Sequence, residues 1–252
     1  RVFVTGGTGF IGGHIIRQLL TSGHEVSALV RSEGGADRLP REVSTVMGDV
    51  LDPDLASIIP DVDALIHLVG IIRESKGVTF QRLHTEATVN VIRAMKERRI
   101  QRLVHMSALG ADVDGPTEYF RSKGLAERAV KESGLHWTIL RPSVVFGPGD
   151  QFVSMLAGQV CSLPPVPVIG DGSYRMQPLW IGDVARGFVD ALHLDATIGK
   201  SYDIGGPEEL TYDQIADTIG EALGKSPVSK AHFPLALMRP VIKVMEGISF
   251  FP

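Results

Sequence analysis

The sequence predicts an α/β fold in which a doubly wound parallel sheet is followed by a small C-terminal lobe. Short apolar runs alternate with amphipathic helical patterns through the first 140 residues. Continuous apolar strands of this kind are typical of parallel sheets with helices on both faces. A glycine-rich turn also joins the first apolar run to the first helical pattern. Beyond residue 140 prolines and glycines become frequent, which indicates loops that cross to a second lobe.

The elements of the first half follow in order. Residues 1–4 predict a strand, and a helix with apolar positions at Ile11, Ile15 and Leu19 follows it and ends at Gly23. Further strands are predicted at residues 26–30, 43–47, 64–69, 103–106 and 137–140. A second amphipathic helix is predicted over residues 79–98, with apolar positions at Phe80, Leu83, Ala87 and Val91.

The second half of the chain predicts more loops and fewer regular elements. Its expected elements are loops at 141–150 and 162–175, a helix over 180–194 and a strand at 200–204. A last helix begins at Thr211, where Gln214 completes a capping box, and ends at Gly224.

These elements predict two domains. A large dinucleotide-binding domain is expected over residues 1–148, completed by 181–205, and a small substrate-side lobe over 149–180 and 206–252, with its C-terminus incomplete. The apolar tail 233–252 is interrupted by charged residues, and a transmembrane helix needs about twenty nearly uncharged ones. We expect this tail to pack on the lobe, with a membrane-surface element as the alternative.

Composition excludes several classes of protein. The 252 residues can bury a large core, and a net charge of −4 does not favour nucleic acid as a partner. The single cysteine, Cys161, rules out a disulfide framework and fits a reducing compartment. The eight histidines lack metal-ligand spacing, so no metal site is predicted. No signal-peptide pattern precedes the first strand, so a cytoplasmic location is expected, or an organellar one if a targeting segment is missing.

The turn Thr5–Gly12 predicts a phosphate-binding site. Gly6, Gly9 and Gly12 are spaced by three, which leaves no side chain where the backbone must approach a pyrophosphate. The unpaired N–H groups and the dipole of the following helix favour phosphate at its start. The alternative is a tight strand-to-helix turn that binds nothing.

Three residues predict proton-transfer chemistry. Ser107 ends the strand at 103–106, and carboxyl ends of strands face the ligand crevice in a doubly wound sheet. Tyr119 and Lys123 lie four residues apart, so on a helix they share a face. A neighbouring ammonium would lower the pKa of the phenol, which would make Tyr119 an acid/base, while Ser107 orients the reacting oxygen. The alternative for the Tyr/Lys pair is a solvated helix face.

Together these motifs resemble the short-chain dehydrogenase/reductase superfamily, in its extended and atypical branches. The matching segments are Thr5–Gly12, 48–50 (Gly-Asp-Val), Ser107, Tyr119 with Lys123, 141–148 (Arg-Pro-Ser-Val-Val-Phe-Gly-Pro) and 178–185 (Pro-Leu-Trp-Ile-Gly-Asp-Val-Ala). Residues 66–70 (Ile-His-Leu-Val-Gly) replace the Asn-Ala-Gly motif of classical members, a departure that is usual in these branches.

The resemblance implies a Rossmann fold and assigns roles to matching positions. It implies that Asp49 lies by the adenine, that Pro142 to Val145 lie by the nicotinamide, and that Lys123 also holds the nicotinamide ribose. The dinucleotide-binding residues predicted from the motifs and from the resemblance together are Gly6, Thr8, Gly9, Phe10, Ile11, Gly12, Arg31, Ser32, Asp49, Val50, Leu68, Val69, Gly70, Lys123, Pro142 and Val145.

The end of the second strand predicts NADP(H) rather than NAD(H). NAD sites of this fold place an acid there for the ribose hydroxyl, whereas NADP sites use a cation for the 2′-phosphate. This chain has Arg31 and Ser32, with the first acid only at Glu33. Arg31 can grip a phosphate in a fork, and Ser32 can donate a hydrogen bond. NAD(H) is the alternative, with Arg31 then a solvent-facing loop residue.

Residues 141–152 are most similar to the atypical group that contains the NAD(P)H-binding accessory subunit of respiratory complex I and its bacterial relatives. This resemblance leaves two functions open. One is an oxidoreductase or epimerase/dehydratase-type enzyme that acts on a small carbonyl, an alcohol or a nucleotide sugar, as the Tyr119/Lys123 pair favours. The other is a non-catalytic NAD(P)H-binding protein of an assembly, with association to a membrane surface or a respiratory complex. The substrate and the oligomeric state are not predicted.

Overall fold

The computed structural model describes residues 1–162, 164–234 and 236. The chain divides into two compact units: unit 1 comprises residues 1–143 and 181–204, and unit 2 comprises 144–180 and the residues from 205 onward. The first boundary therefore falls slightly before the predicted one at residue 148. The predicted packing of the tail 237–252 lies outside the described residues.

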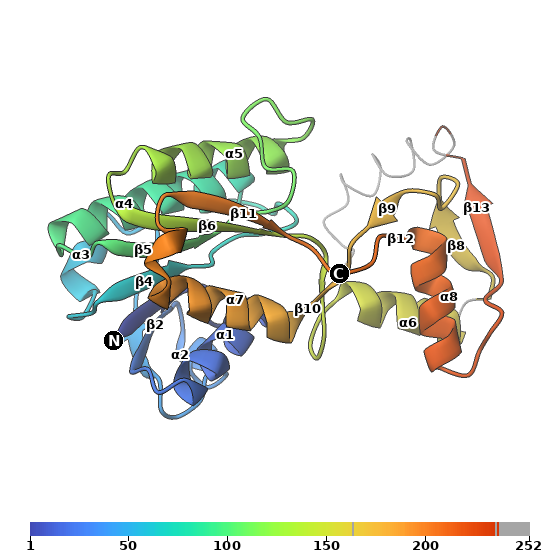
Figure 1. The fold of residues 1–252 in the computed structure, drawn as a ribbon, viewed down its shortest axis with the longest axis horizontal. Coiled ribbons are helices and arrows are strands. Elements are labelled where there is room, and N and C mark those ends of the chain that lie inside the picture. The colour runs from blue at the N-terminus through green and yellow to red at the C-terminus, as the bar shows by residue number, and fades with distance from the viewer. Residues whose placement is uncertain (163, 235, 237–252) are drawn as a thin grey trace. The chain divides into compact units, whose positions relative to one another are not determined.

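Within the described residues, unit 1 is built on one seven-stranded sheet whose strand pairs are all parallel (Figure 1). The strand order is β11-β6-β5-β4-β1-β2-β3. The strands are β1 Val2–Thr5, β2 Val26–Val30, β3 Ser44–Met47, β4 Ala64–His67, β5 Arg102–Met106, β6 His136–Pro142 and β11 Lys200–Ile204. The predicted doubly wound parallel fold is confirmed.

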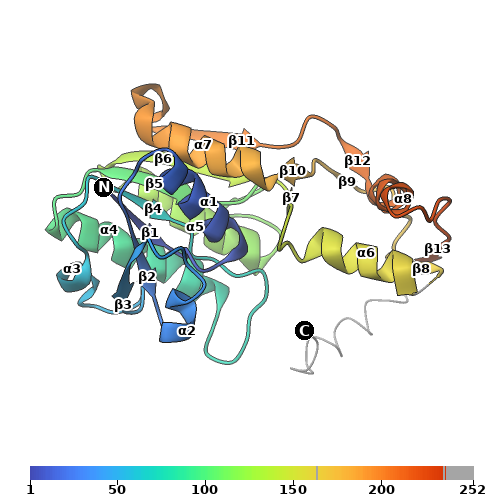
Figure 2. The ribbon, with the colours of Figure 1, turned by 90° about the horizontal axis from the view of Figure 1, so that it is seen from below.

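Helices cover both faces of this sheet (Figures 1 and 2). One face carries α1 (Phe10–Thr21) and α7 (Ile181–His193), and the other carries α3 (Leu55–Ile58), α4 (Ala87–Glu97) and α5 (Glu118–Lys131). The short helix α2 (Glu33–Ala36) follows β2. The layers arise because each helix has one apolar stripe, which is removed from water only against the sheet.

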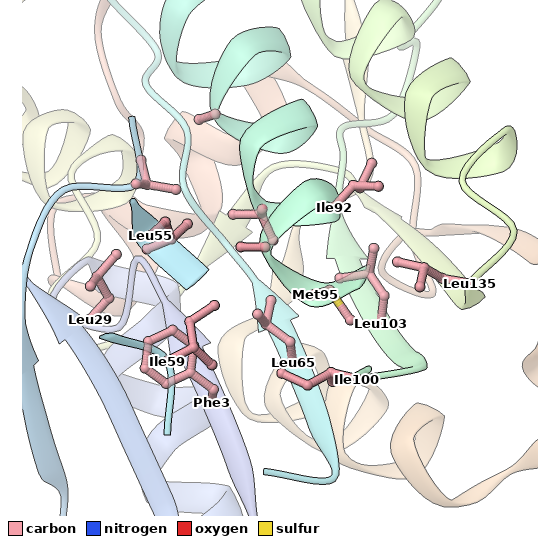
Figure 3. Packing of buried hydrophobic residues seen from close by; sticks show 14 of the residues in the cluster. Phe3, Leu29, Leu55, Ile59, Leu65, Ile92, Met95, Ile100, Leu103 and Leu135 are labelled. Atoms are coloured by element: carbon pink, nitrogen blue, oxygen red, sulfur yellow. The ribbon is translucent and has the colours of Figure 1, made fainter. Parts of the chain in front are cut away.

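A large apolar cluster lies between the sheet and the helices α3, α4 and α5 (Figure 3). Phe3, Leu65 and Leu103 come from three neighbouring strands and are fully buried. Met95 of α4 is also fully buried in this cluster. Each such side chain stabilises the fold by about 1.5–3 kcal/mol through burial. This cluster therefore fixes the strand ends that carry the site.

The predicted burial of the third strand is wrong. Ser44 and Thr45 are exposed, and Met47 is 52% exposed. The reason is position: β3 pairs only with β2 and forms the edge of the sheet. An apolar run cannot by itself distinguish an edge strand from a central one.

The sheet has a topological switch point between β1 and β4. Strands β2 and β3 extend the sheet on one side of β1, while β4, β5, β6 and β11 extend it on the other. Thr5, the last residue of β1, pairs in register with His67, the last residue of β4. Ligands of open α/β sheets bind at the carboxyl ends of strands at such a point.

A chain of buried polar side chains crosses this switch point. The two ring nitrogens of His67 are hydrogen-bonded to Thr5 Oγ1 of β1 (2.6 Å) and to Thr88 Oγ1 of α4 (3.1 Å). Thr88 Oγ1 donates in turn to the carbonyl oxygen of His84 (2.5 Å). These bonds tie both central strands to the helix that covers them.

The predicted helix over 79–98 has two parts. It begins as a π-helix at Gln81–Glu86 and continues as α4 from Ala87. The expected single α-helix is therefore wrong over its first part. A π-helical turn holds more residues than an α-helical one, which changes the direction in which Leu83 and His84 project, and such turns are frequent at functional sites.

Unit 2 is a small lobe of helices and short strand pairs. Its helices are α6 (Phe152–Ser162) and α8 (Tyr212–Ala222), and the predicted capping box of Thr211 and Gln214 is confirmed. The strand pairs are β7 Val145–Phe146 with β10 Leu179–Trp180, β8 Val166–Ile169 with β13 Lys230–Phe233, and β9 Arg175–Met176 with β12 Leu210–Thr211. Its core contains Leu156, Val160, Val166, Val168, Tyr212, Ile215 and Ala216.

Two predicted loops are wrong in part. The segment 141–150 contains the end of β6 and strand β7, and the segment 162–175 contains β8 and the start of β9. Proline lacks a backbone donor, but it is tolerated in short two-stranded pairs such as β8 with β13. The predicted helix at 180–194 begins one residue later, because Trp180 belongs to β10.

Across the part of the chain that the structure describes, no helix has both the length and the apolar character needed to cross a bilayer.

Candidate functional site

A pocket of about 210 Å³ opens at the carboxyl ends of β1 and β4 in unit 1. The predicted dinucleotide-binding residues that line it are Gly6, Thr8, Gly9, Arg31, Asp49, Val50, Leu68, Val69 and Gly70. The structure adds Leu29, Ile71 and Leu83, which the sequence did not indicate. Leu83 has a signal in the sequence, its apolar position on the predicted helix, but that signal indicates core packing rather than a pocket.

Two glycines let the turn after β1 close on its neighbours. Gly6 has φ +80°, and a Cβ there would lie 2.9 Å from the backbone of Leu68. A Cβ on Gly12 would overlap the carbonyl oxygen of Gly6. The first turn of α1 therefore packs against the turn only because both positions lack a side chain.

Gly9 differs from these two glycines, because a side chain there would not collide with the rest of the protein. A Cβ on Gly9 would lie 3.4 Å from the Gly6 carbonyl oxygen, which is an ordinary contact. Gly9 is the N-cap of α1, and no side chain caps it. The first N–H groups of a helix have no acceptor within it, and they lie at the positive end of the helix dipole. Gly9 thus leaves backbone donors open toward the pocket, where an anion fits.

Asp49 and Val50 form the wall of the pocket beyond β3. Oδ1 of Asp49 accepts the backbone N–H of Leu51 (2.9 Å). The side-chain amide of Asn90 in α4 donates to the carbonyl oxygens of Val50 (2.8 Å) and Asp52 (2.6 Å). This wall is therefore fixed to the helix layer by side-chain bonds to its backbone.

Arg31 and Ser32 follow directly after β2, and Arg31 lines the pocket with an exposed side chain. Ser32 is the N-cap of α2, and its Oγ accepts the backbone N–H of Gly35 (3.2 Å). The hydroxyl proton of Ser32 remains available as a donor. One cation and one hydroxyl donor thus occupy the positions predicted to receive a 2′-phosphate.

Helix α5 carries Tyr119, Lys123 and Glu127 at successive i+4 positions, so the three side chains share one face. Lys123 is only 3% exposed, and its Nζ donates to the carbonyl oxygen of Met106 at the end of β5 (3.2 Å). A Cβ on Gly70 would lie 3.0 Å from Nζ. The ammonium therefore lies directly behind the wall of the pocket.

Burial changes the pKa values of Lys123 and Tyr119, two of the three predicted catalytic residues. Desolvation lowers the pKa of Lys123 to about 8, although the nearby Glu127 carboxylate opposes the shift. Desolvation raises the pKa of Tyr119. The predicted lowering of the Tyr119 pKa by Lys123 is therefore wrong, because removal of the phenolate from water determines the direction of the shift. At neutral pH Tyr119 is a neutral phenol.

Aromatic rings surround Tyr119 and explain this desolvation. Its ring meets Phe80, His84 and Phe120 edge to face, with centroid separations of 5.6, 5.4 and 5.3 Å. Rings at these distances exclude water from the sides of the phenol without offering it a charge.

His84 joins the pocket wall to α5 and was not predicted as a site residue. It is 1% exposed, and its Nδ1 lies 2.8 Å from Ser122 Oγ, which itself donates to the carbonyl oxygen of Tyr119 (2.9 Å). The backbone N–H of Ile71 donates to Nε2 (3.0 Å). Nε2 also lies 3.1 Å from the carbonyl oxygen of Ile71, so both backbone groups of Ile71 contact this ring nitrogen. Burial, with a contribution from Lys123, lowers the pKa of His84 to about 3, so the ring is neutral.

Two further buried histidines lie beneath the site. Desolvation lowers the pKa of His67 to about 3 and that of His105 well below its usual value, with smaller effects from Lys123. Their rings stack with centroids 5.4 Å apart. Among the described residues neither ring nitrogen of His105 has a hydrogen-bond partner. Both rings are thus buried and neutral.

Ser107 lies between β5 and the carboxylate of Glu127. Its backbone N–H donates to the carbonyl oxygen of Leu140 (2.8 Å), and it is 3% exposed. Its Oγ is close enough to Glu127 to favour the charged carboxylate, yet makes no bond of good geometry to any described residue. The hydroxyl is therefore not fixed by a well-aligned bond among the described residues.

The remaining predicted residues fall in different places. Phe10 and Ile11 begin α1, and their backbone N–H groups belong to its open first turn. Pro142 ends β6 and accepts the backbone N–H of Leu109 (3.1 Å). Val145 belongs to β7 of unit 2, so its role beside a nicotinamide stays a prediction.

The chain matches two family models. Residues 6–151 match the NAD(P)H-binding family, and residues 110–249 match the RmlD substrate binding domain. The first match covers the glycine turn from Gly6 onward, every residue that lines the pocket, and the Tyr119/Lys123 pair.

Relatives of several activities are similar over most of the chain. The mitochondrial NADH dehydrogenase [ubiquinone] 1 alpha subcomplex subunit 9 of Arabidopsis thaliana is 30% identical over 92% of this chain, which spans 60% of that protein's length. The 3-beta-hydroxysteroid dehydrogenase of Mycolicibacterium neoaurum is 28% identical over 89% of this chain and 70% of its own length.

The fold is also that of a solved epimerase. The Thermus thermophilus UDP-glucose 4-epimerase, crystallised as a complex with NAD, is 25% identical, with a TM-score of 0.79 over 96% of this chain and 93% of that one. The resemblance predicted from the sequence motifs is confirmed. The chain belongs to the NAD(P)H-binding proteins of the short-chain dehydrogenase/reductase superfamily, in its extended branch.

Proposed function

We propose that this protein is an NADP(H)-dependent oxidoreductase that reduces a small carbonyl compound or oxidises the corresponding alcohol. The observation that carries the proposal is the position of Lys123. Its ammonium lies behind Gly70 in the pocket wall and shares a helix face with Tyr119. A phenol and an ammonium on one helix face, with the ammonium next to Gly70 of the pocket wall, are the groups that proton transfer beside a nicotinamide requires.

The pocket fits a dinucleotide on the chain's own geometry. The open N-terminus of α1 at Gly9 would receive the pyrophosphate, and Asp49 and Val50 would flank the adenine. Arg31 and Ser32 would hold a 2′-phosphate, because a guanidinium and a hydroxyl are donors for phosphate oxygens, whereas a carboxylate would repel them. We infer a preference for NADP(H) over NAD(H) from these two residues.

The residues around Tyr119 suit the reductive direction. When bound, the nicotinamide supplies or accepts the hydride. Tyr119 holds its proton at neutral pH because burial raises its pKa, so it would donate that proton to the oxygen of a carbonyl substrate. Ser107, whose Oγ lacks a well-aligned partner among the described residues, would hydrogen-bond the same oxygen. Lys123 would hold the ribose and stabilise the phenolate that proton donation leaves.

The relatives support this class of substrate without identifying one. The 3-beta-hydroxysteroid dehydrogenase is named for the oxidation of an alcohol, and the Thermus enzyme is named for a nucleotide sugar. A nucleotide sugar is therefore an alternative to a simple carbonyl or alcohol, with epimerase or dehydratase chemistry.

A second candidate is a non-catalytic NAD(P)H-binding protein that serves an assembly. The specific observation in its favour is the similarity to the Arabidopsis complex I subunit over 92% of this chain. In that case the cofactor would stabilise the fold, the partner would be a respiratory complex, and the location would be organellar rather than cytoplasmic.

The deciding experiment combines binding and turnover. NADPH binding is measured by calorimetry, and turnover is followed by NADPH absorbance with a panel of aldehydes, ketones and nucleotide sugars. Tyr119→Phe keeps the ring but removes the transferable proton. We expect it to bind NADPH as the parent does and to lose about 10²- to 10⁴-fold in turnover. Tyr202→Phe, on β11, is the matched control and should keep the parent activity.

Each outcome selects one function. Loss of turnover in Tyr119→Phe alone supports the enzyme. Tight NADPH binding with no turnover of any compound in the panel favours the assembly protein. Unchanged turnover in Tyr119→Phe contradicts the proposed role of the phenol.

A further inference from the structure

We propose that Glu127 is a positioning residue of this site, which keeps the Lys123 ammonium charged and fastens its helix to the end of β6. The inference rests on the proposed function, because it concerns the group that would hold the ribose. It adds to that function a residue that touches neither cofactor nor substrate.

Glu127 lies one helical turn after Lys123 on the same face of α5, and its side chain is 2% exposed. A carboxylate removed from water in this way is costly unless other groups replace its hydration. Arg141 replaces it with a two-point contact: Nε donates to Oε1 (2.7 Å) and Nη2 donates to Oε2 (2.6 Å). Lys131 Nζ donates to Oε2 (3.0 Å). Glu127 is thus held as a charged group in one orientation.

Because of the position of Arg141, this ion pair connects α5 to the sheet. Arg141 is the residue before Pro142, with which β6 ends. Its Nη1 also meets Oδ1 of Asp203 in β11 (3.3 Å), on the exposed side. The planar guanidinium therefore joins the helix to two neighbouring strands through fixed hydrogen bonds. Without Glu127, the face of α5 that carries Lys123 would no longer be attached to the ends of these strands.

The groups that face Lys123 from the neighbouring elements are neutral. They are His67 of β4, His84 of the π-helix and His105 of β5. On α5 itself, Tyr119 lies one turn before Lys123 and is also neutral. Neutral groups with this burial do not compensate for the lost hydration of an ammonium.

Burial disfavours the charged form of Lys123, whereas the Glu127 carboxylate favours it. Its pKa is lowered overall: burial tends to raise it, but Arg141, Ser107 and Lys131 favour the carboxylate more.

The cations bound to Glu127 do not cancel this effect. The side chain of Lys131 is 42% exposed and that of Arg141 is 24% exposed, so water screens their charges. Lys123 is buried, so its interaction with Glu127 is screened less. The carboxylate therefore favours the charged form of Lys123 although it is also bound to Arg141 and Lys131.

The test measures the charge of Lys123 directly. Lysine labelled with ¹³C at Cε is incorporated, the Lys123 resonance is assigned with Lys123→Arg, and its titration is followed by NMR in the cofactor-free protein. The parent midpoint is expected near pH 8. Glu127→Gln should lower it by about one to three pH units, the usual effect of a nearby opposite charge. Asp203→Asn removes the other carboxylate bound to Arg141 and should leave the midpoint unchanged.

A second variant keeps the test valid if Glu127→Gln does not fold. Glu127→Gln replaces the buried carboxylate that binds Arg141 with a neutral amide. Glu127→Asp keeps the charge pair but withdraws the carboxylate by one methylene group. It should give a midpoint between those of the parent and Glu127→Gln. The pH at which NADPH affinity falls by half should follow the NMR midpoint in every variant.

The two proposals fail separately. If the parent binds no NADP(H) at any pH, the proposed function is lost, while the NMR titration still tests the pairing of Glu127 and Lys123. If NADPH binds but Glu127→Asp and every folded Glu127 variant keep the parent midpoint, Glu127 is not a positioning residue and the proposal is overturned.

Discussion

The backbone N–H of Ile71 donates to Nε2 of His84 over 3.0 Å, and this bond attaches the loop after β4 to the π-helix. The other ring nitrogen lies 2.8 Å from Ser122 Oγ in α5, one turn from Tyr119. One buried imidazole thus connects a wall of the pocket with the helix that carries the proposed acid/base.

Replacing this imidazole should loosen both connections. His84→Phe keeps a ring of similar size but leaves the Ile71 N–H without its acceptor. We expect the free energy of unfolding to fall by about 1–3 kcal/mol, the cost of an unsatisfied buried polar group. NADPH affinity should weaken as well. Urea denaturation and calorimetry measure the two effects, and His136→Phe, on the exposed start of β6, should change neither. Unchanged stability and affinity in His84→Phe would contradict the bridging role.

Acid should destabilise the fold through its buried histidines. The folded pKa values of His67 and His84 are about 3, and that of His105 is well below 6.5. Below about pH 6.5 the unfolded chain therefore binds protons that the folded protein does not. Their contribution to stability is fully present above that pH and is lost as the pH falls.

The expected slope can be measured. Each buried histidine should lower the free energy of unfolding by about 1.4 kcal/mol per pH unit between roughly pH 6 and 4.5. Urea titrations at a series of pH values give the total slope, and His84→Phe should reduce it by one histidine's share. A stability that is flat over this range would mean that the three rings are not held neutral.

A side chain at Gly9 should block the cofactor without disturbing the fold. A Cβ there meets the protein only at an ordinary contact distance, but it would occupy the opening at the N-terminus of α1. Gly9→Val should lose NADPH binding while its melting temperature stays near that of the parent. Gly187→Val, at an open position of α7, is the control and should bind normally. Normal calorimetric binding by Gly9→Val would place the pyrophosphate elsewhere.

The choice between the two nicotinamide cofactors should depend on Arg31. Arg31→Ala should weaken NADPH binding by roughly ten- to a hundredfold, the usual contribution of a charge-assisted contact, and leave NADH binding unchanged. Arg38→Ala removes a nearby exposed cation that does not line the pocket and should have no such effect. A parent that prefers NADH, or an equal loss for both cofactors, would refute the assignment.

Much of the fold could be predicted because local patterns determine it. The strand at 26–30 and the capping box at Thr211 depend on residues close in sequence, and both were predicted correctly. The exposed edge strand β3 and the short pairs of unit 2 depend on partners far along the chain. Hydrophobic periodicity contains no information about those partners.

The candidate site shows the same division. The glycine turn and the Tyr/Lys spacing are local, so the sequence could point to them. The pKa of Tyr119 depends on rings contributed by Phe80 and His84, and the charge of Lys123 depends on burial beneath β4 and β5. These effects come from three-dimensional desolvation, and the expected lowering of the Tyr119 pKa was wrong for that reason.

The placement of β1 between β2 and β4 has a consequence for the order in which the site can form. Strand β2 pairs with β1 after a short helical connection, whereas β4 lies far later in the chain. During synthesis the glycine turn therefore emerges long before its opposite wall, Leu68 to Gly70, and pairings of this sequence separation close slowly. A nascent chain that ends before β4 contains the phosphate loop but only half of a pocket. In this architecture a complete nucleotide pocket therefore forms late, only after β4 has paired with β1.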